Sequence, residues 1–275
     1  MGRFVCSQGK GLYVNILYYL ALKNAGFIAE QLGDKTQLGI CKKKARQTHS
    51  IINKYFWYNG DTHTKCYVNF ITSHAKIYFG TENYKKNDLS NLVKKCILPC
   101  KTILQNDSYY LPYITFRDFG ERFDSFGNLL AILSGIADEK HSRLLLDFIK
   151  RNNLANPFPI KAIYPTIAHG GKDWREYYHH SNRNLPHQYH NGGIWPFLGG
   201  FYVAALVKMK EYTEAKKVLT SLALLNKKGK ESSWEFNEWF HGQTAKPIGQ
   251  VKQAWSAGMY VYAYETVRQK KALFF

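Results

Sequence analysis

Apolar residues recur every three or four positions along most of the chain, which is the spacing of an amphipathic helix. Residues 12–32 show this spacing, and Gly33 follows where a helix would end. The same spacing predicts helices over residues 40–56, 89–105, 127–137, 140–152, 195–210, 211–225 and 251–270. Residues 66–71 fit either a short strand or an extended loop. The pattern therefore predicts an all-α protein with roughly eight helices and few strands.

The predicted helices come in pairs, one of them joined across Asp138-Glu139, with long polar loops between alternate pairs. Residues 156–184 hold most of the turn-forming prolines and glycines, which is typical of a long functional loop. No Pro/Ser-rich linker or shift in composition divides the chain. We therefore predict a single domain over residues 1–275, built as a helical toroid with its long loops on one rim.

The net charge of +18 raises the possibility of nucleic-acid binding. The lysines, however, are spread along the chain, and the clusters at residues 42–44, 227–230 and 270–271 are typical of solvated helix ends and turns. A basic nucleic-acid-binding protein therefore stays as an alternative and is not the leading interpretation.

The five cysteines form no CxxC pair, which favours free thiols in a reducing compartment. The first residues lack the apolar core of a signal peptide, and no run reaches the roughly 18 apolar residues of a membrane span. These observations predict a cytoplasmic protein that does not enter a membrane.

The segment Tyr189–Pro196 combines a tyrosine, a histidine, an asparagine, two glycines and a tryptophan. Aromatic faces stack on the C–H faces of a sugar ring, and histidine and asparagine bind hydroxyl groups. Glycine lets a ligand approach the backbone. The segment therefore indicates a sugar-binding pocket.

Glu235 and Glu238 lie among aromatic residues that could dry them and shift their pKa values. Glycoside hydrolysis needs two carboxyl groups, roughly 6.5–9.5 Å apart in inverting enzymes. Two side chains on one helical turn lie too close together for that pair, so one of the two could be catalytic and the other structural. The alternative is a pair of surface carboxylates.

Two aspartates are weaker candidates. Asp124 precedes an apolar helix, so taken alone it is better explained as an N-terminal cap than as a catalyst. Asp173 lies in the long loop, where charged and aromatic residues alternate as in the rim of a polar-ligand site. A packed loop with internal ion pairs explains it equally well.

The histidines at positions 179, 180, 187 and 190 lack the HExxH spacing of a zinc site, so we expect no metal. The serines lie in no nucleophile elbow, and no complete phosphate-binding fingerprint follows Gly9. No cofactor is therefore expected.

Several blocks together resemble the neutral/alkaline invertases and the related amylo-alpha-1,6-glucosidases of the glycogen-debranching type. They are the segments Gly9–Tyr19, Phe123–Ile132, Tyr189–Phe197, Glu238–Gly242 and Gln253–Gly258. The resemblance covers essentially the whole chain. It implies the (α/α)6 barrel of the six-hairpin glycosidases and the hydrolysis of an α-glucosidic or sucrose-type bond.

The resemblance also assigns roles to residues. It places the catalytic base or nucleophile on Glu238, because Glu238–His241 runs on to Ile248-Gly249 with the spacing of the family's segment. It also implies that the subsite of the cleaved sugar is lined by His190, Asn191, Trp195, Gln253 and Trp255. The residue patterns described above add Asp124, Asp173, Tyr189, Gly192 and Trp239 as candidate substrate-binding residues.

One departure from the family limits this assignment. The general acid of the family is an Asp a few residues upstream of the block that begins at Gln8, and Met1–Ser7 contains no carboxylate. The resemblance therefore implies an incomplete toroid whose acid lies before Met1 or is absent. A positioned proton donor contributes about 10²–10⁴-fold to the rate, so we expect weak or no activity from the chain alone. The alternatives are an inactive remnant or a sugar-binding module, and a homo-oligomer or a missing N-terminal half is a possible partner.

Overall fold

The structure is a computed structural model that describes residues 10–59, 103–104, 106–115, 119–176, 184–273 and 275. The chain divides into two compact units, Met1–Arg122 and Phe123–Phe275, called unit 1 and unit 2 below. The prediction of a single domain stays a prediction.

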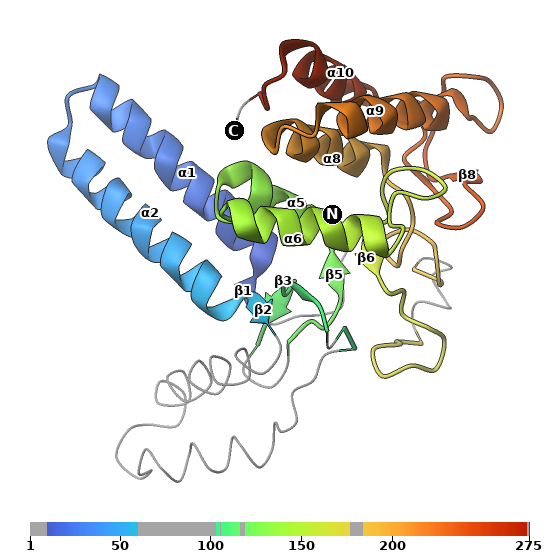
Figure 1. Cartoon of the computed structure of the whole chain (residues 1–275), viewed down its shortest axis with the longest axis horizontal. Helices are drawn as coiled ribbons and strands as arrows, with labels where there is room; N and C mark the ends of the chain where they lie inside the picture. Colours follow the sequence, from blue (N-terminus) through green and yellow to red (C-terminus); the bar gives the residue numbers. More distant parts are fainter. Residues whose placement is uncertain (1–9, 60–102, 105, 116–118, 177–183, 274) are drawn as a thin grey trace, which may run out of the picture. The chain divides into compact units, whose positions relative to one another are not determined.

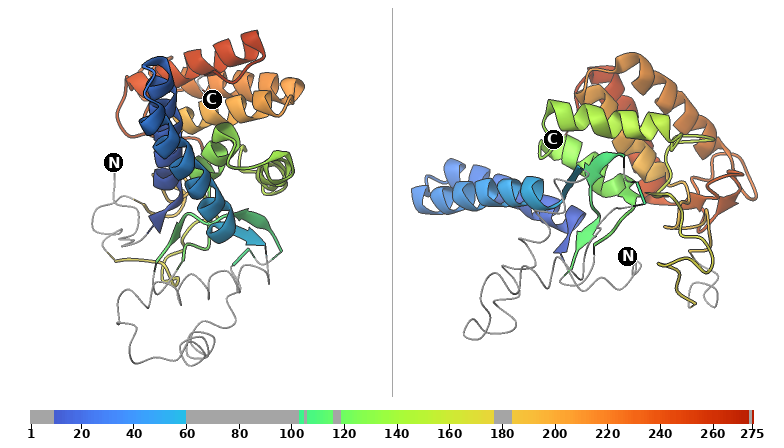
Figure 2. Two further views of the ribbon diagram at one scale, coloured as in Figure 1. Left: turned by 90° about the vertical axis from the view of Figure 1, so that its left-hand side faces the viewer. Right: turned by 60° about the horizontal axis from the view of Figure 1, so that its bottom comes forward.

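Unit 1 contains two antiparallel helices, α1 (Leu12–Gln31) and α2 (Lys35–Tyr55), which lie side by side in Figures 1 and 2. The chain turns at Gly33, whose φ of 71° suits glycine. Asp34 then caps α2, because its carboxylate accepts a hydrogen bond from the backbone N–H of Gln37 at 2.9 Å. The second helix was predicted to begin at residue 40, and this cap starts it five residues earlier.

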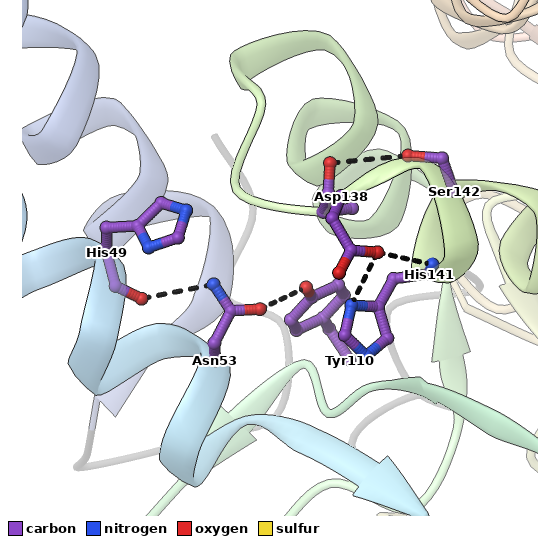
Figure 3. A network of polar contacts seen from close by, with 7 residues as sticks. His49, Asn53, Tyr110, Asp138, His141 and Ser142 are labelled. Carbon is purple, nitrogen blue, oxygen red and sulfur yellow. Dashed lines mark hydrogen bonds and ion pairs between the residues drawn. The ribbon is translucent and has the colours of Figure 1, made fainter.

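Short strands close unit 1. The strand β1 (Lys10–Gly11) pairs with β4 (Tyr113–Ile114), and β2 (Trp57–Asn59) pairs with β3 (Ser108–Tyr110), both antiparallel. The hydroxyl of Tyr110 donates to Asn53 Oδ1 at 2.6 Å, which ties β3 to α2 (Figure 3). The predicted segment 66–71 lies outside the described residues, as does most of the predicted helix 89–105; its residues 103 and 104 form a turn.

Unit 2 starts at β5 (Phe123–Asp124), which pairs antiparallel with β6 (Ile163–Tyr164). Two helices follow β5, α5 (Ser125–Ser134) and α6 (Glu139–Arg151). The first ends at Gly135, which has a φ of 77°. The second is capped by Asp138, whose carboxylate accepts from the N–H of His141 at 2.8 Å (Figure 3). Both helices match the predicted pair, and the long loop predicted after them contains only β6 among its described residues.

The core of unit 2 is α8 (Pro196–Lys208), which contacts α5, α9 (Tyr212–Lys227) and α10 (Ala254–Gln269). Nearly every residue of α8 is buried, which explains why its sequence is apolar on all sides. Gly199 and Gly200 allow this packing. A Cβ on Gly199 would lie 3.0 Å from the carbonyl oxygen of Pro159, and one on Gly200 would lie 2.7 Å from that of Met259.

The strands β7 (Trp239–Phe240) and β8 (Pro247–Ile248) form a hairpin before α10. All strands of the described residues have two or three residues, and the same residues form seven helices. The helical class predicted from the sequence is therefore confirmed. None of the helices in the described part of the chain is long and apolar enough to cross a membrane. Cys41 is a free buried thiol, and the other cysteines lie outside the described residues.

Candidate active site

Four rings from the predicted sugar-binding residues form one cluster in unit 2. His190 stacks on Trp195 with ring centroids 4.9 Å apart and an angle of 5° between the planes. Tyr189 lies between Trp195 and Trp239, at centroid distances of 5.2 Å and 5.9 Å. Trp195 and Trp239 are buried, whereas Tyr189 and His190 are half-buried. The partly exposed rings of Tyr189 and His190 can therefore contact a ligand, while the buried tryptophans pack against them.

The glycines of the segment have a packing role. Gly192 has a φ of 84°, and a Cβ there would lie 2.4 Å from Cγ2 of Thr166. A Cβ on Gly193 would lie 2.4 Å from the carbonyl oxygen of Tyr189. The chain therefore needs both glycines to fold back on itself beneath the rings, in addition to any role in admitting a ligand.

Asn191 is fully engaged with the backbone. Its Nδ2 donates to the carbonyl oxygens of Ile167 and Asn184, both at 2.9 Å, and its Oδ1 accepts from the N–H of Ile167 at 2.6 Å. The side chain is only 2% exposed. Asn191 therefore connects the long loop to the ring-bearing segment through hydrogen bonds. The spacing of residues along the chain did not predict this contact.

Backbone hydrogen bonds join the ring-bearing segment to the segment of Glu238. Ile194 and Phe240 exchange two N–H···O bonds of 2.8 Å, and the N–H of Gly242 donates to the carbonyl oxygen of His187 at 2.7 Å. Residues separated by about fifty positions in the sequence are thereby held side by side. The two motifs that indicated carbohydrate chemistry are consequently hydrogen-bonded to each other.

Glu238 is half-buried and held by the residues that follow β8. The N–H of Gln250 donates to its Oε2 at 3.2 Å, and no described residue donates a hydrogen bond to its Oε1. Gly249 packs directly against this carboxylate, since a Cβ there would lie 2.7 Å from Oε2. The carboxylate is therefore oriented at one oxygen, and its other oxygen has no hydrogen-bond donor among the described residues.

Glu235 is held in a different way. Its carboxylate accepts three backbone N–H bonds, from Lys230 at 2.7 Å and from Glu231 and Ser232 at 2.8 Å each. Burial by itself raises the pKa of Glu235, but these hydrogen bonds outweigh it and leave the pKa below the usual value. Glu235 thus organises the loop before β7.

The two glutamates do not share a helical turn. Trp234 and Phe236 have φ values of 64° and 52°, so the chain around Glu235 is an irregular loop. Of the four aromatic residues expected to dry the carboxylates, Trp239 and Phe240 are buried, but Trp234 is 48% exposed. The division into one structural and one available carboxylate therefore arises from hydrogen bonding and not from helical spacing.

The imidazoles near the site are poor proton acceptors. Burial lowers the pKa of His190 to about 3, so its ring is neutral at ordinary pH. Burial also lowers the pKa of His187 and of His241, whose ring centroids lie 6.0 Å apart. A neutral ring can donate one hydrogen bond to a hydroxyl and accept another.

Asp124 caps α5, as the sequence predicts. Its Oδ1 and Oδ2 accept from the N–H groups of Phe126 and Gly127 at 3.3 Å and 3.1 Å. Burial raises the pKa of Asp124 to about 6, although the two hydrogen bonds act in the opposite direction. The cap accounts for its position in the fold, and a role in substrate binding stays a prediction.

Three further predicted residues, Asp173, Gln253 and Trp255, make no ring contact with this cluster among the interactions of the described residues. Asp173 is half-buried in a turn closed by a 2.9 Å bond from the N–H of Trp174 to the oxygen of Gly171. The N–H of Gln253 donates to the oxygen of Phe236 at 3.0 Å, which fixes the start of α10. Trp255, in the first turn of α10, is 49% exposed.

Sequence reasoning gave no separate role to Gln250 or Gly249, the residues that hold Glu238. The only signal for them was the Ile248-Gly249 pair in the family's spacing. Among the described residues, no three His, Cys, Asp or Glu side chains gather as a metal site would require.

The comparisons with known proteins identify the family of the chain. The sequence model of the family described as alkaline and neutral invertase matches residues 2–270. Alkaline/neutral invertase C, mitochondrial, from Arabidopsis thaliana is 25% identical over 95% of this chain and 38% of its own length. Alkaline/neutral invertase E, chloroplastic, from the same plant is 32% identical over 52% of this chain and 23% of its own length. The chain thus spans less than two-fifths of the length of these relatives.

A solved structure supports the fold. A bacterial glucoamylase in complex with acarbose has a TM-score of 0.60 to this chain at 14% identity, covering 96% of this chain and 34% of the glucoamylase. This likeness confirms the predicted (α/α)6 glycosidase architecture. With the match over residues 2–270, the chain belongs to the alkaline and neutral invertase family of glycoside hydrolases.

Proposed function

We propose that the chain carries the sugar-binding and water-activating half of a glycosidase site that acts on a sucrose-type or α-glucosidic bond. The observation that carries this proposal is the backbone pairing of Ile194 with Phe240, which holds the ring cluster beside the segment of Glu238. The family resemblance and the geometry support the same residue as the base.

In the proposed mechanism the sugar ring lies against Tyr189 and His190, backed by Trp195. The neutral imidazole of His190 hydrogen-bonds a sugar hydroxyl. Glu238 takes a proton from a water molecule through its open Oε1 while that water attacks the anomeric carbon. The bond from that carbon to the leaving oxygen breaks, and a general acid must protonate that oxygen.

The proposal assigns the general acid to no residue of this chain. A substrate whose leaving group needs no proton therefore gives the sharpest test. α-Glucosyl fluoride is such a substrate, because fluoride departs as an anion. We expect the purified chain to hydrolyse α-glucosyl fluoride measurably and sucrose much more slowly.

The matched variants are Glu238→Gln and Glu231→Gln, since Glu231 is an exposed glutamate on the preceding loop. Loss of fluoride release with Glu238→Gln, and retention with Glu231→Gln, supports the assignment. Equal turnover by both variants contradicts it. If the chain releases no fluoride but sucrose or glucose quenches its tryptophan fluorescence, the sugar-binding module is the better interpretation.

Trp195→Leu tests the binding half separately. The indole supports both Tyr189 and His190 and donates through Nε1 to the carbonyl oxygen of Tyr189 at 3.0 Å. We expect its removal to weaken sugar binding about tenfold, the loss of roughly one aromatic contact and one hydrogen bond. Isothermal titration with sucrose measures this, and an unchanged affinity would exclude these rings as the sugar platform.

A further inference from the structure

A basic groove runs between α1 and α2 in unit 1, and the proposed glycosidase function makes no use of it. Its volume is about 390 Å³, and it is lined by Tyr19, Lys23, Lys42, Ala45, Arg46 and His49. Pockets for small molecules are usually about 300–1,000 Å³, so the groove has room for a small ligand.

The helical spacing places these side chains on two facing walls. Tyr19 and Lys23 are four residues apart on α1, and Lys42, Arg46 and His49 lie on one face of α2. Buried Ala45 forms the floor between them. The groove is therefore a product of the helix pair, and no single run of lysines makes it.

The positive charges of the groove are poorly neutralised. Lys42 Nζ lies 3.6 Å from Oε1 of Glu30, which is a long, exposed ion pair. Arg46 forms no ion pair with any described residue, and Lys23 lies over the ring of Tyr19 at 5.6 Å. Three cations thus face one groove, and among the described residues only Lys42 has a carboxylate partner, Glu30. This excess of positive charge attracts a compact anion.

The neighbouring part of the groove is more apolar, although it contains one carboxylate. A second hollow of about 230 Å³ shares Lys23, Lys42 and Ala45 with the first and adds Leu22, Phe27 and Leu38, together with Glu30. A ligand that fills both parts carries an anionic group at one end and an apolar group at the other.

We propose that this groove binds a small phosphate ester, with its phosphate at Lys23, Lys42 and Arg46 and its organic group along Leu22, Phe27 and Leu38. Arginine and lysine form charge-assisted hydrogen bonds to phosphate, and arginine can bind two of its oxygens at once. The rings of Tyr19 and His49, 5.9 Å apart, border the phosphate end.

Isothermal titration of the full chain with phenyl phosphate, glucose 6-phosphate and inorganic phosphate tests the proposal. We expect phenyl phosphate to bind about tenfold more tightly than inorganic phosphate, because only the ester reaches the apolar part. Glucose 6-phosphate carries a polar organic group where phenyl phosphate carries an apolar one. If glucose 6-phosphate binds more tightly than phenyl phosphate, the apolar contacts are not used and the proposal is overturned.

The control is a pair of double variants with the same change of charge on the same helix. Lys42→Gln with Arg46→Gln removes two lining cations, whereas Lys43→Gln with Lys44→Gln removes two exposed cations that do not line the groove. We expect the first pair to weaken phenyl phosphate binding about tenfold or more, and the second to leave it within about twofold. Circular dichroism checks that both variants fold.

Three results would overturn the proposal. They are equal weakening by both double variants, no binding of phenyl phosphate at about 10 mM, and a single-stranded oligonucleotide that binds more tightly than phenyl phosphate and responds equally to both pairs. The last result would identify the basic surface as a site for a nucleic acid.

Discussion

The loop of Glu235 and the hairpin of Glu238 place the same side chain in two opposite environments only three residues apart. Glu235 is 4% exposed and accepts three backbone N–H bonds, so its oxygens are occupied by the fold. Glu238 is half-buried and accepts one such bond, at Oε2, and no described residue donates to its Oε1. The comparison teaches that hydrogen-bond saturation distinguishes a structural carboxylate from one available for chemistry.

The largest expected effect tests the availability of Glu238. Glu238→Gln should reduce the turnover of α-glucosyl fluoride by about 10³-fold, because an amide cannot take a proton from water. Its thermal unfolding temperature should stay almost unchanged, since one weak hydrogen bond is retained by the amide oxygen. Kinetics and calorimetry on the same preparation measure both. If Glu238→Gln instead lowers the unfolding temperature strongly and still hydrolyses α-glucosyl fluoride, then Glu238 is a structural carboxylate and not a catalytic one.

The next effect tests the structural role of Glu235. In Glu235→Gln an amide N–H₂ group replaces one of the two oxygens, so it faces either the backbone donor of Lys230 or those of Glu231 and Ser232. We therefore expect the unfolding temperature to fall by about 5 °C. The exposed Glu231→Gln is the matched control and should change it little. Calorimetry of the two variants at pH 7 measures the difference.

The pH dependence of this difference gives an independent test. The folded pKa of Glu235 is below the ordinary 4.5, so its contribution to stability is present above that pH and is lost as pH falls through the folded pKa. The gap between the parent chain and Glu235→Gln should therefore narrow in acid. A gap of the same size at pH 7 and pH 3 would show that the charge of Glu235 is not what holds the loop.

A smaller effect is expected where the chain holds Glu238. In Gly249→Ala the new methyl group would lie 2.7 Å from Oε2 of Glu238, and the φ of 73° disfavours alanine. We expect about a tenfold loss in turnover through displacement of the carboxylate, together with a cost of about 1 kcal/mol from the backbone. Gly135→Ala, at a φ of 77° with open space around it, is a control for the backbone cost alone. Equal turnover in the two variants would show that Gly249 does not position Glu238.

The smallest effect concerns the neutral ring beside the site. Because the pKa of His190 falls to about 3 on folding, the unfolded chain binds a proton between pH 6.5 and about 3 that the folded chain does not. Stability should therefore decrease as pH falls through this window. In His190→Gln the free energy of unfolding should change less between pH 7 and pH 5. His187 and His241 act in the same direction, so part of the dependence should remain.

The helices could be predicted well because their signal is local. Apolar spacing located α1, α5, α6, α8, α9 and α10 within a few residues, and it misplaced the start of α2, where Asp34 adds a cap. Residues 103 and 104, predicted to lie in a helix over 89–105, form a turn, and the rest of that prediction lies outside the described residues. The cap at Asp124 was also predictable, since it needs only a polar side chain before an apolar helix.

The site was predictable in part. The sequence singled out Tyr189, His190, Trp195 and Trp239, whose rings do gather. It also suggested that one of Glu235 and Glu238 could be structural. It did not predict that the amide of Asn191 would hydrogen-bond to the backbone of the long loop, because those partners lie 7 and 24 residues away in the chain.

The sequence by itself determined the helical pattern, the family and the residue types of a carbohydrate site, because these depend on local spacing and on motifs. Only the tertiary structure decided which groups are free to act. Burial and backbone hydrogen bonds between distant segments occupy Glu235 and Asn191 and leave one oxygen of Glu238 open. Such contacts depend on how the chain is folded in space, which no local pattern encodes.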